Sequence, residues 1–323
     1  MDYEIVATLG PSSASPDVWQ RLLAAGATAF RLNTSHLSLP ELHAWLDGLG
    51  AFFDAREAQT ALVLDLQGSK WRLGTFPTAT LVAGQEVELV LGETSRSGLA
   101  LPVPHADFFR AAQASSGEIV LNDAKIRLAL EEAGEQLLLA RVLLGGEISS
   151  RKGITYTDSA YRQEQLNEID RAILAQTSGL DCVRYAISYV RDALEMERYR
   201  AQLGGRRLIA KLERAPALRE ALLIARLVDE VWLCRGDLGA ELGLRGMAEA
   251  AASFAEQAPG LAAPALLAGQ VLEHMTHNPT PTRSEVCYLY EALQKGFRGV
   301  VLSDETAVGE YPIESCQAAA MFK

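Results

Sequence analysis

Cysteine and positive charge are both scarce in this sequence. Its 323 residues include four widely spaced cysteines, Cys182, Cys234, Cys287 and Cys316, and no CxxC motif. We therefore expect neither a disulfide framework nor a zinc site, and a reducing cytoplasm is the simplest setting. Acidic residues outnumber basic ones by 41 to 30, which gives a formal net charge of −11. This balance disfavours non-specific binding to nucleic acid or to an anionic membrane, but it still allows a locally basic pocket.

Long apolar runs are also missing. No run reaches the roughly 18 residues that a membrane-spanning helix needs. The first residues, MDYEIVATLG, contain acidic side chains and no basic one, so we do not expect a signal peptide. Apolar residues make up 49% of the chain and charged ones 22%, as in ordinary globular proteins, which excludes a disordered, collagen-like or coiled-coil protein. The length fits two domains of roughly 150 residues or one (β/α)8 barrel of about 250 residues with an addition.

Strand-like segments alternate with amphipathic segments over most of the chain. This order predicts parallel strand pairing with right-handed crossovers. We interpret eight segments as strands of such a sheet: 4–10, 28–33, 60–68, 181–188, 206–213, 229–237, 263–269 and 299–303. The helices expected between and after them cover 16–26, 39–57, 165–179, 191–205, 216–228, 246–257, 283–296 and 313–322. This strand number is that of a (β/α)8 barrel.

The alternation stops between the third and the fourth strand. Residues 75–157 contain short β-rich runs punctuated by glycine, such as QEVELVLGE and QLLLARVLLGG, and no comparable helical spacing. We therefore predict an α/β fold in which residues 1–74 and 158–323 form a (β/α)8 (TIM) barrel. Residues 75–157 are expected to form a small all-β domain inserted after the third strand.

Charged and polar residues gather where five of the predicted strands end. In a (β/α)8 barrel the chemistry lies on the loops that follow the carboxyl ends of the strands. The residues concerned are Arg31, Asn33 and Ser35, Asp65, Lys70 and Arg72, Lys211 and Glu213, Arg235 and Asp237, and Ser303, Asp304 and Glu305. Taken alone, a structural ion pair of Lys211 with Glu213 or Asp237 explains part of this set equally well. The convergence of charge from five strands on one rim favours a functional site.

The residue types indicate phosphoryl chemistry. Glu213 and Asp237 supply the oxygen ligands that Mg²⁺ prefers, and this ion completes its shell with substrate oxygens and water. Arg31, Arg72 and Lys211 supply positive charge for phosphate oxygens. A metal together with cations in one pocket suits phosphoryl transfer. The sequence shows no Ser-His-Asp arrangement or cysteine nucleophile, and GSKWRLG lacks the spacing of a Walker loop.

A series of motifs in this chain resembles the pyruvate kinase family. FRLNTSH resembles the family's MRLNFSH, LDLQGSKWR its LDTKGPEIR, AKLE its AKIE, and CRGDLGAE its ARGDLGVE. TLGPSS, NPTPTRSE and LSDETAVGEYPIE resemble TIGP, NPRPTRAE and LSGETAKGKYPVE in the same order. The match runs through nearly the whole chain. It implies a barrel interrupted after its third strand by a small β-barrel lid, which is also what the pattern predicts.

The resemblance implies a role for each matching residue. Lys211 would neutralise the phosphoryl group during transfer, and Glu213 and Asp237 would bind Mg²⁺ or Mn²⁺. Arg31 and Arg72 would contact phosphates. Ser303 and Glu305 complete the catalytic set, and Gly236, Asp237, Gly269 and Lys211 would contact phosphoenolpyruvate. The nucleotide, ADP or ATP, would be lined by Thr8, Pro11, Asn33 and His36 and reached by Lys152, and Asp123 would be a lid residue closing over the site.

Two departures from the family concern monovalent cations. In most members the residues matching Asn33, Ser35 and Asp65 hold K⁺ together with a threonine, where this chain has Leu66. The family's glutamate in the GPEIR stretch is Lys70 here, and a subset of the family with this combination works without a monovalent cation. An ammonium on Lys70 can replace the charge of K⁺, so we expect activity that does not require K⁺.

Further departures concern the substrate and regulation. Gly269 replaces a threonine implicated in substrate positioning and enolate protonation, and Asp304 replaces a glycine. The segment after Glu241 lacks the family's basic and glutamine residues. The family's C-terminal allosteric domain has no counterpart up to Lys323, so we expect no effector regulation through it within this chain. A monomer and a homo-oligomer both stay open, as does a separate polypeptide that supplies this domain.

Three hypotheses result. The first is a cytoplasmic, glycolytic enzyme that moves phosphoryl from phosphoenolpyruvate to ADP with Mg²⁺. The second is a diverged phosphotransferase or lyase-type enzyme acting on another phosphorylated or enolisable carboxylate, which Gly269 and Asp304 motivate. The third is a regulator that binds phosphoenolpyruvate or nucleotide without turnover. The third is the least favoured, because Lys211, Glu213 and Asp237 are all present.

Overall fold

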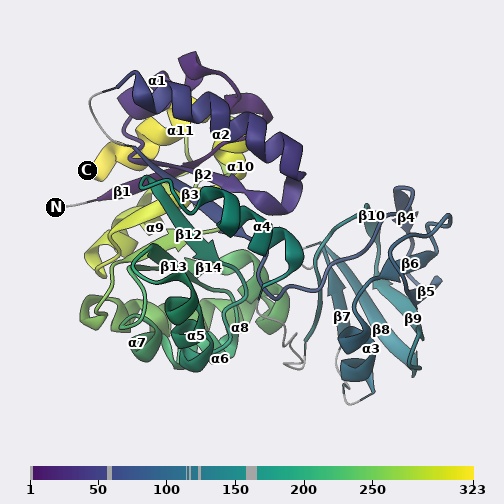
Figure 1. Cartoon of the computed structure of the whole chain (residues 1–323). Helices are drawn as coiled ribbons and strands as arrows, with labels where there is room; N and C mark the ends of the chain where they lie inside the picture. Colours follow the sequence, from purple (N-terminus) through teal and green to yellow (C-terminus); the bar gives the residue numbers. More distant parts are fainter. Residues whose placement is uncertain (1–2, 57–59, 114, 116–117, 123–124, 158–165) are drawn as a thin grey trace. The chain divides into compact units, whose positions relative to one another are not determined.

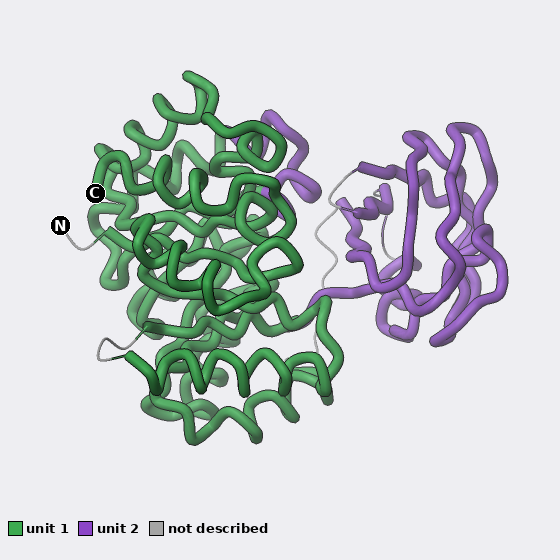
Figure 2. The backbone as a smooth tube through the Cα atoms, turned by 90° about the horizontal axis from the view of Figure 1, so that it is seen from above, with its two compact units in different colours: residues 1–68, 166–235, 249–323 green, residues 69–165, 236–248 purple. Residues whose placement is uncertain are grey.

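The computed structural model describes residues 3–56, 60–113, 115, 118–122, 125–157 and 166–323. The chain divides into two compact units, shown in green and purple in Figure 2. The barrel unit comprises Met1–Gly68, Leu166–Arg235 and Glu249–Lys323. The insertion unit comprises Ser69–Gln165 and Gly236–Ala248. No helix in the described ranges is long and apolar enough to cross a membrane.

The barrel unit is built on a closed barrel of eight parallel strands, as far as the chain is described (Figure 1). Around the barrel the order is β1, β2, β3, β12, β13, β14, β15 and β16, and β16 pairs with β1. The strands are β1 (Glu4–Thr8), β2 (Ala29–Asn33), β3 (Ala61–Leu66), β12 (Val183–Ile187), β13 (Arg207–Leu212), β14 (Glu230–Cys234), β15 (Ala265–Ala268) and β16 (Gly299–Leu302). This topology confirms the predicted (β/α)8 barrel.

The barrel interior is filled by side chains of unequal size. Trp232 from β14 is fully buried, and small residues such as Ala29 and Ala186 from other strands complete the same cluster. A bulky ring is accommodated because small side chains face it, as close packing of an interior requires. Side chains alternate between the two faces of a strand. Every second side chain therefore points into the barrel, and those between them pack against the surrounding helices.

The helices of the chain outside the inserted β-rich segment connect these strands or follow the last of them (Figure 1). They are α1 (Pro16–Ala24), α2 (Leu39–Asp54), α4 (Glu168–Thr177), α5 (Ala193–Leu203), α6 (Ala215–Arg219), α7 (Ala221–Ile224), α8 (Arg235–Gln257), α9 (Arg283–Gln294), α10 (Asp304–Ala307) and α11 (Pro312–Ala319). Ser38 and Thr282 begin α2 and α9 with capping boxes, in which a hydroxyl and a glutamate satisfy backbone N–H groups that have no helical partner.

Three helical regions differ from the sequence prediction. The segment 216–228 forms two short helices, α6 and α7, that meet at Glu220. Helix α8 begins at Arg235 rather than near residue 246, and Gly243 interrupts it with a φ of 68°. Glycine adopts this left-handed conformation without a steric penalty. The four-residue helix α10, which was not predicted, begins directly after Ser303.

The insertion unit is mainly a β structure. As far as it is described, it contains a six-stranded sheet in the order β11, β7, β8, β9, β5, β6 and a two-stranded sheet of β10 and β4. The strands are β4 (Ala79–Leu81), β5 (Glu86–Leu91), β6 (Ala100–Val103), β7 (Glu118–Leu121), β8 (Ile126–Ala133), β9 (Leu137–Leu144), β10 (Gly146–Ile148) and β11 (Ile154–Tyr156). Its place between β3 and β12 in the chain confirms the predicted insertion after the third strand.

The insertion unit also contains a short helix, α3 (Ala106–Ala112), which corrects the all-β prediction. Phe108 and Phe109 of this helix are fully buried. The ring of Tyr156 stacks on Phe108 at a centroid distance of 4.6 Å, and its hydroxyl donates to the carbonyl of Phe108 at 3.1 Å. The helix is too short to show a clear helical period in the sequence, and it is stabilised by this aromatic packing instead.

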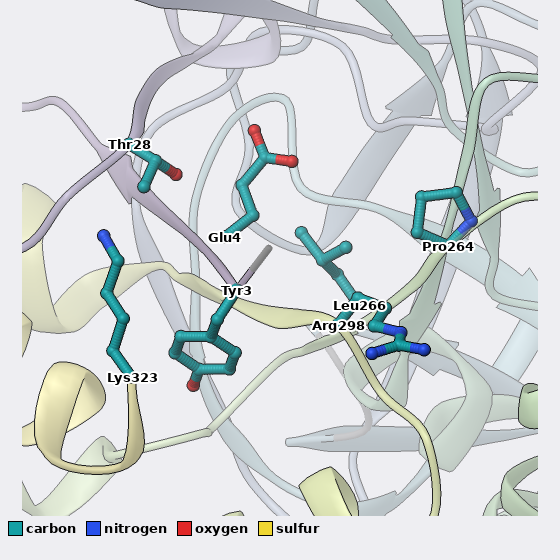
Figure 3. Close-up of a pocket in the computed structure, with 7 residues that line it drawn as sticks. All are labelled: Tyr3, Glu4, Thr28, Pro264, Leu266, Arg298 and Lys323. Carbon is teal, nitrogen blue, oxygen red and sulfur yellow. The ribbon is translucent and has the colours of Figure 1, made fainter. Parts of the chain in front are cut away.

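The amino-terminal end of the barrel carries a buried acidic group and a pocket. The Arg184 guanidinium lies 2.6 Å from Glu4 and 3.6 Å from Glu230, and Trp232 donates its indole N–H to Glu230. Burial, together with the charge of Glu4, raises the pKa of Glu230 to about 8. The adjacent pocket has a volume of about 680 Å³ (Figure 3). It is lined by Tyr3, Glu4, Thr28, Pro264, Leu266, Arg298 and Lys323.

The buried Glu230 makes stability depend on pH. The folded protein keeps this proton up to about pH 8, whereas the unfolded chain releases it near its ordinary pKa of 4.5. The free energy of unfolding therefore falls as the pH rises between these two pKa values. Glu230→Gln has no proton to release at this position and should not lose this stability. Relative to wild type, the variant should gain on the order of 3 kcal/mol between pH 5 and pH 8.5. Urea unfolding at both pH values measures this, and equal shifts for the two proteins would contradict it.

Candidate active site

A cluster of buried charges lies at the carboxyl ends of four neighbouring strands of the barrel unit. We call Arg31, Asp65, Ser188, Lys211 and Glu213 the charged cluster. The ammonium of Lys211 lies 3.1 Å from a carboxylate oxygen of Asp65 and 2.9 Å from one of Glu213, and it donates to the hydroxyl of Ser188 at 2.8 Å. All five residues are buried. The structure thus brings together four residues that the sequence predicted and one, Ser188, that it did not.

Asp65 is the centre of this cluster. It accepts hydrogen bonds from Nε and Nη2 of Arg31 at 2.8 and 2.5 Å and from the hydroxyl of Ser188 at 2.9 Å. Arg31 in turn donates through Nη1 to the hydroxyl of Thr8 at 2.7 Å. The carboxylate therefore joins strands β2 and β3 to the residue after β12, and its ion pair with Lys211 adds β13.

The charges of the cluster hold one another in the ionised state. Burial alone would raise the pKa of Asp65, but the charges of Lys211 and Arg31 outweigh it, so this pKa lies below its ordinary value. Burial alone would lower the pKa of Lys211, but Asp65 and Glu213 outweigh it, and this pKa lies well above its ordinary value. The ammonium of Lys211 is therefore a fixed positive charge at neutral pH.

The loop after β3 is fixed by contacts that sequence reasoning missed. Gly68 has a φ of 60°, and a Cβ atom there would lie 2.1 Å from the carbonyl oxygen of Ser188, so only glycine fits. The fully buried Asp170 accepts from the backbone N–H groups of Gln67 and Gly68 at 3.0 and 2.9 Å. Ser188 had a detectable signal, because it is a polar residue at the end of a predicted strand.

The residues predicted to line a nucleotide lie at the ends of β1 and β2 and in the turns that follow these strands. Thr8 ends β1, and Pro11 begins the short turn η1 (Pro11–Ser13). The side-chain oxygen of Asn33 accepts from the N–H of Ser35 at 3.2 Å and caps the turn η2 (Thr34–His36), whose last residue, His36, is exposed. Both turns follow carboxyl ends of strands, which is the predicted rim of the barrel.

Glu305 has a structural partner for each of its carboxylate oxygens. One oxygen accepts from the N–H of Ser303 at 2.6 Å and the other from the N–H of Leu272 at 3.0 Å. The side chain is fully buried, and this burial raises its pKa. It thereby braces the loops after β15 and β16 against each other. Asp304, the neighbouring departure from the family pattern, is exposed.

The turn after β15 has a backbone that suits glycine. Gly269 has a φ of 81° and Gln270 one of 53°, which is the left-handed region that β-branched residues avoid. Arg235 holds this turn by donating to the carbonyl of Gly269 at 3.0 and 2.7 Å and to that of Gln270 at 2.8 Å. Its guanidinium also lies 4.8 Å from the ring centre of Tyr288. The glycine is thus matched to the conformation of this backbone.

In the insertion unit, Lys70 and Asp237 form an ion pair that the sequence did not predict. Their charged atoms are 2.6 Å apart. The Lys70 side chain passes close to Gly153, where a Cβ atom would lie 2.2 Å from its Cε. Arg72 donates to the carbonyl of Arg151 at 3.3 Å. Gly236 lies with Asp237 in the first turn of α8, Lys152 is half-buried, and Asp123 falls outside the described residues.

Glu213 carries oxygen donors of the kind that a hard divalent cation prefers. One oxygen of Glu213 faces Lys211, and the other accepts from the N–H of Tyr189 at 2.7 Å. A carboxylate oxygen that accepts one hydrogen bond keeps another lone pair, and Mg²⁺ often uses only one or two protein carboxylates. Among the described residues, no group of three or more His, Cys, Asp or Glu side chains is arranged to hold a metal.

The fold and the charged rim define the chain as a (β/α)8-barrel protein with an inserted β unit, and comparisons identify its family. A family model described as the barrel domain of pyruvate kinase matches residues 2–316. Pyruvate kinases of Methylorubrum extorquens and Aeropyrum pernix are 34% and 31% identical to the chain, each over 97% of its length and over 66% and 68% of theirs. The chain belongs to the pyruvate kinase family and spans about two thirds of the length of these relatives.

A solved structure gives the same fold. The crystal structure of a pyruvate kinase from Cryptosporidium parvum aligns with a TM-score of 0.85 at 21% sequence identity, over 99% of this chain and 68% of that one. The alignment supports the combination of barrel and inserted β unit described above.

Replacing Asp65 by asparagine tests how much the charged cluster contributes to the stability of the fold. Asp65→Asn leaves Lys211 and Arg31 buried without their shared carboxylate, which typically costs about 3–5 kcal/mol. Chemical unfolding should show this loss. Glu310→Gln is the matched control, because Glu310 pairs with His277 on an exposed surface of the same unit and such pairs contribute little. An equal, small effect of both changes would contradict the role of Asp65.

Proposed function

We propose that this chain transfers the phosphoryl group of phosphoenolpyruvate to ADP in the presence of Mg²⁺ or Mn²⁺, giving pyruvate and ATP. The observation that carries the proposal is the buried ammonium of Lys211, fixed by Asp65, Glu213 and Ser188 at the carboxyl end of β13. Phosphoryl transfer depends mainly on positioning and on charge placed in advance, and a cation held in this way requires no rearrangement when negative charge develops.

The remaining predicted residues have complementary roles in this proposal. Lys211 places its positive charge beside the transferring phosphoryl group, and Arg31 and Arg72 contact phosphate oxygens. The backbone N–H groups of Gly236, Asp237 and Leu238 receive the substrate carboxylate. Gly236 and Asp237 belong to the first turn of α8, where N–H groups have no partner within the helix and attract anions.

Glu213 and Asp237 would hold the divalent metal. When bound, Mg²⁺ would neutralise oxygens of the substrate and of the transferring group. Thr8, Pro11, Asn33 and His36, together with Lys152, would line the nucleotide. The enolate left after transfer needs a proton to become pyruvate. Gly269 has no side chain to supply it, so we propose that water does. This function belongs to glycolysis and to the cytoplasm.

We propose further that no K⁺ is needed. The support is the ammonium of Lys70, which lies 2.6 Å from Asp237 and so supplies a positive charge beside a carboxylate of the site. The rate of pyruvate release should be the same in K⁺-free buffer as in K⁺ buffer. Lys70→Met should slow the reaction, with partial recovery on adding K⁺, whereas the exposed Lys125→Met should change nothing. A wild-type enzyme that requires K⁺ would refute this role of Lys70.

Replacing Lys211 by arginine tests the role of the fixed ammonium. Lys211→Arg keeps the positive charge but moves its centre, because a planar guanidinium differs in shape from an ammonium. We expect kcat to fall roughly 100-fold or more, the usual cost of losing a group placed to stabilise the transition state. Arg207→Lys, at the exposed start of the same strand, is the control and should keep the wild-type rate. A near-normal rate for Lys211→Arg would contradict the mechanism.

A second function is favoured by the turn at Gly269. The backbone there is matched to glycine, so the chain lacks a side-chain hydroxyl at this position, and Asp304 adds a negative charge after the neighbouring strand β16. An enzyme acting on another phosphorylated or enolisable carboxylate would explain both. Such an enzyme would turn over another member of a substrate panel but not phosphoenolpyruvate. A regulator would instead bind phosphoenolpyruvate or nucleotide and turn over no member of the panel.

A further inference from the structure

Glu213 is held by a backbone group in a strained conformation. The N–H of Tyr189 donates to one of its carboxylate oxygens at 2.7 Å, while Lys211 occupies the other at 2.9 Å. Tyr189 has a φ of 62°. A bulky residue in this left-handed region is an outlier that persists only where the surrounding structure enforces it. The orientation of the Glu213 carboxylate therefore depends on whatever keeps Tyr189 in place.

The guanidinium of Arg214 stacks on the ring of Tyr189. Its Cζ lies 4.3 Å from the centre of the Tyr189 ring, a distance at which a cation and an aromatic face attract each other. Both side chains are buried, with 3% and 4% of their surface exposed, and such an attraction is stronger when water is excluded. Arg214 directly follows Glu213 in the chain, so the contact ties both ends of the Tyr189–Glu213 hydrogen bond together.

The charge of Arg214 is balanced within the same unit. Glu195 of helix α5 is buried, and one of its oxygens accepts from the N–H of Arg191 at 2.6 Å. Burial raises the pKa of Glu195, and the positive charge of Arg214 opposes this rise. Arg214 therefore lies over an aromatic ring and within electrostatic reach of an acidic side chain, and a planar guanidinium stacks on a ring better than an ammonium does.

We propose that Arg214 is a positioning residue that acts through Tyr189 to orient the Glu213 carboxylate for a divalent metal. The proposal rests on the proposed function, because it assumes that Glu213 is a metal ligand. Residues that orient a ligand from the second layer commonly change metal affinity by 10- to 100-fold when they are replaced. Loss of the stacked guanidinium should therefore weaken metal binding and leave the chemistry at saturating metal largely unchanged.

The test is the affinity of the full chain for Mn²⁺, measured from the electron paramagnetic resonance signal of the free ion. Arg214→Lys should raise the dissociation constant about tenfold, raise the KM for Mn²⁺ in parallel and preserve kcat at saturating Mn²⁺. Tyr189→Leu, which removes the ring, should have the same effect. The double variant should be no worse than either single one, because both changes remove one contact.

Arg56→Lys is the matched control. The Cζ atom of Arg56 lies 5.3 Å from the ring centre of Phe52 in the same unit. Arg56→Lys therefore makes the same chemical change at another stacked pair. This variant should bind Mn²⁺ with the affinity of wild type. Thermal unfolding reports whether each variant folds, and if Arg214→Lys does not fold, Tyr189→Leu carries the same expectation. Folded Arg214→Lys and Tyr189→Leu variants that bind Mn²⁺ as tightly as wild type would overturn this inference and leave the proposed function standing. If Glu213→Gln also binds Mn²⁺ normally, the metal assignment in the proposed function fails and the inference fails with it.

Discussion

The carboxylate of Asp65 is the interaction on which the rest of the site depends. It sits at the end of β3 and pairs with both Arg31 and Lys211. Two buried cations would otherwise repel each other and lose their hydration at high cost. One carboxylate between them allows both to stay charged, and the hydroxyls of Ser188 and Thr8 complete the hydrogen bonding. The barrel supplies this geometry because neighbouring parallel strands end at the same rim.

Much of this arrangement is visible in the sequence. The alternation of strands and helices predicts the barrel and the place of the insertion, and the structure confirms both. Lys211 and Glu213 are recognisable because charges two residues apart follow an apolar strand. The short helices α3 and α10 and the break at Glu220 were missed, because segments of a few residues are stabilised by tertiary packing rather than by a period in the sequence.

The contacts that position the site were harder to predict. Asp170 reaches the loop after β3 from a helix about a hundred residues further along the chain. Arg214, after β13, stacks on Tyr189, which follows β12 and has a positive φ. The pairing of Lys70 with Asp237 likewise joins distant segments. Side-chain partners of this kind depend on the folded geometry, and no local spacing in the sequence specifies them. Gly269 looks like a lost functional group in the sequence, whereas the structure shows a turn matched to glycine.

The central claim is that this rim of buried charge performs phosphoryl transfer from phosphoenolpyruvate. The most direct measurement is the release of pyruvate by the wild-type chain from phosphoenolpyruvate and ADP, followed with and without divalent metal. The account predicts pyruvate and ATP in equal amounts, formed only when Mg²⁺ or Mn²⁺ is present. A folded chain that forms no pyruvate with either metal would contradict it.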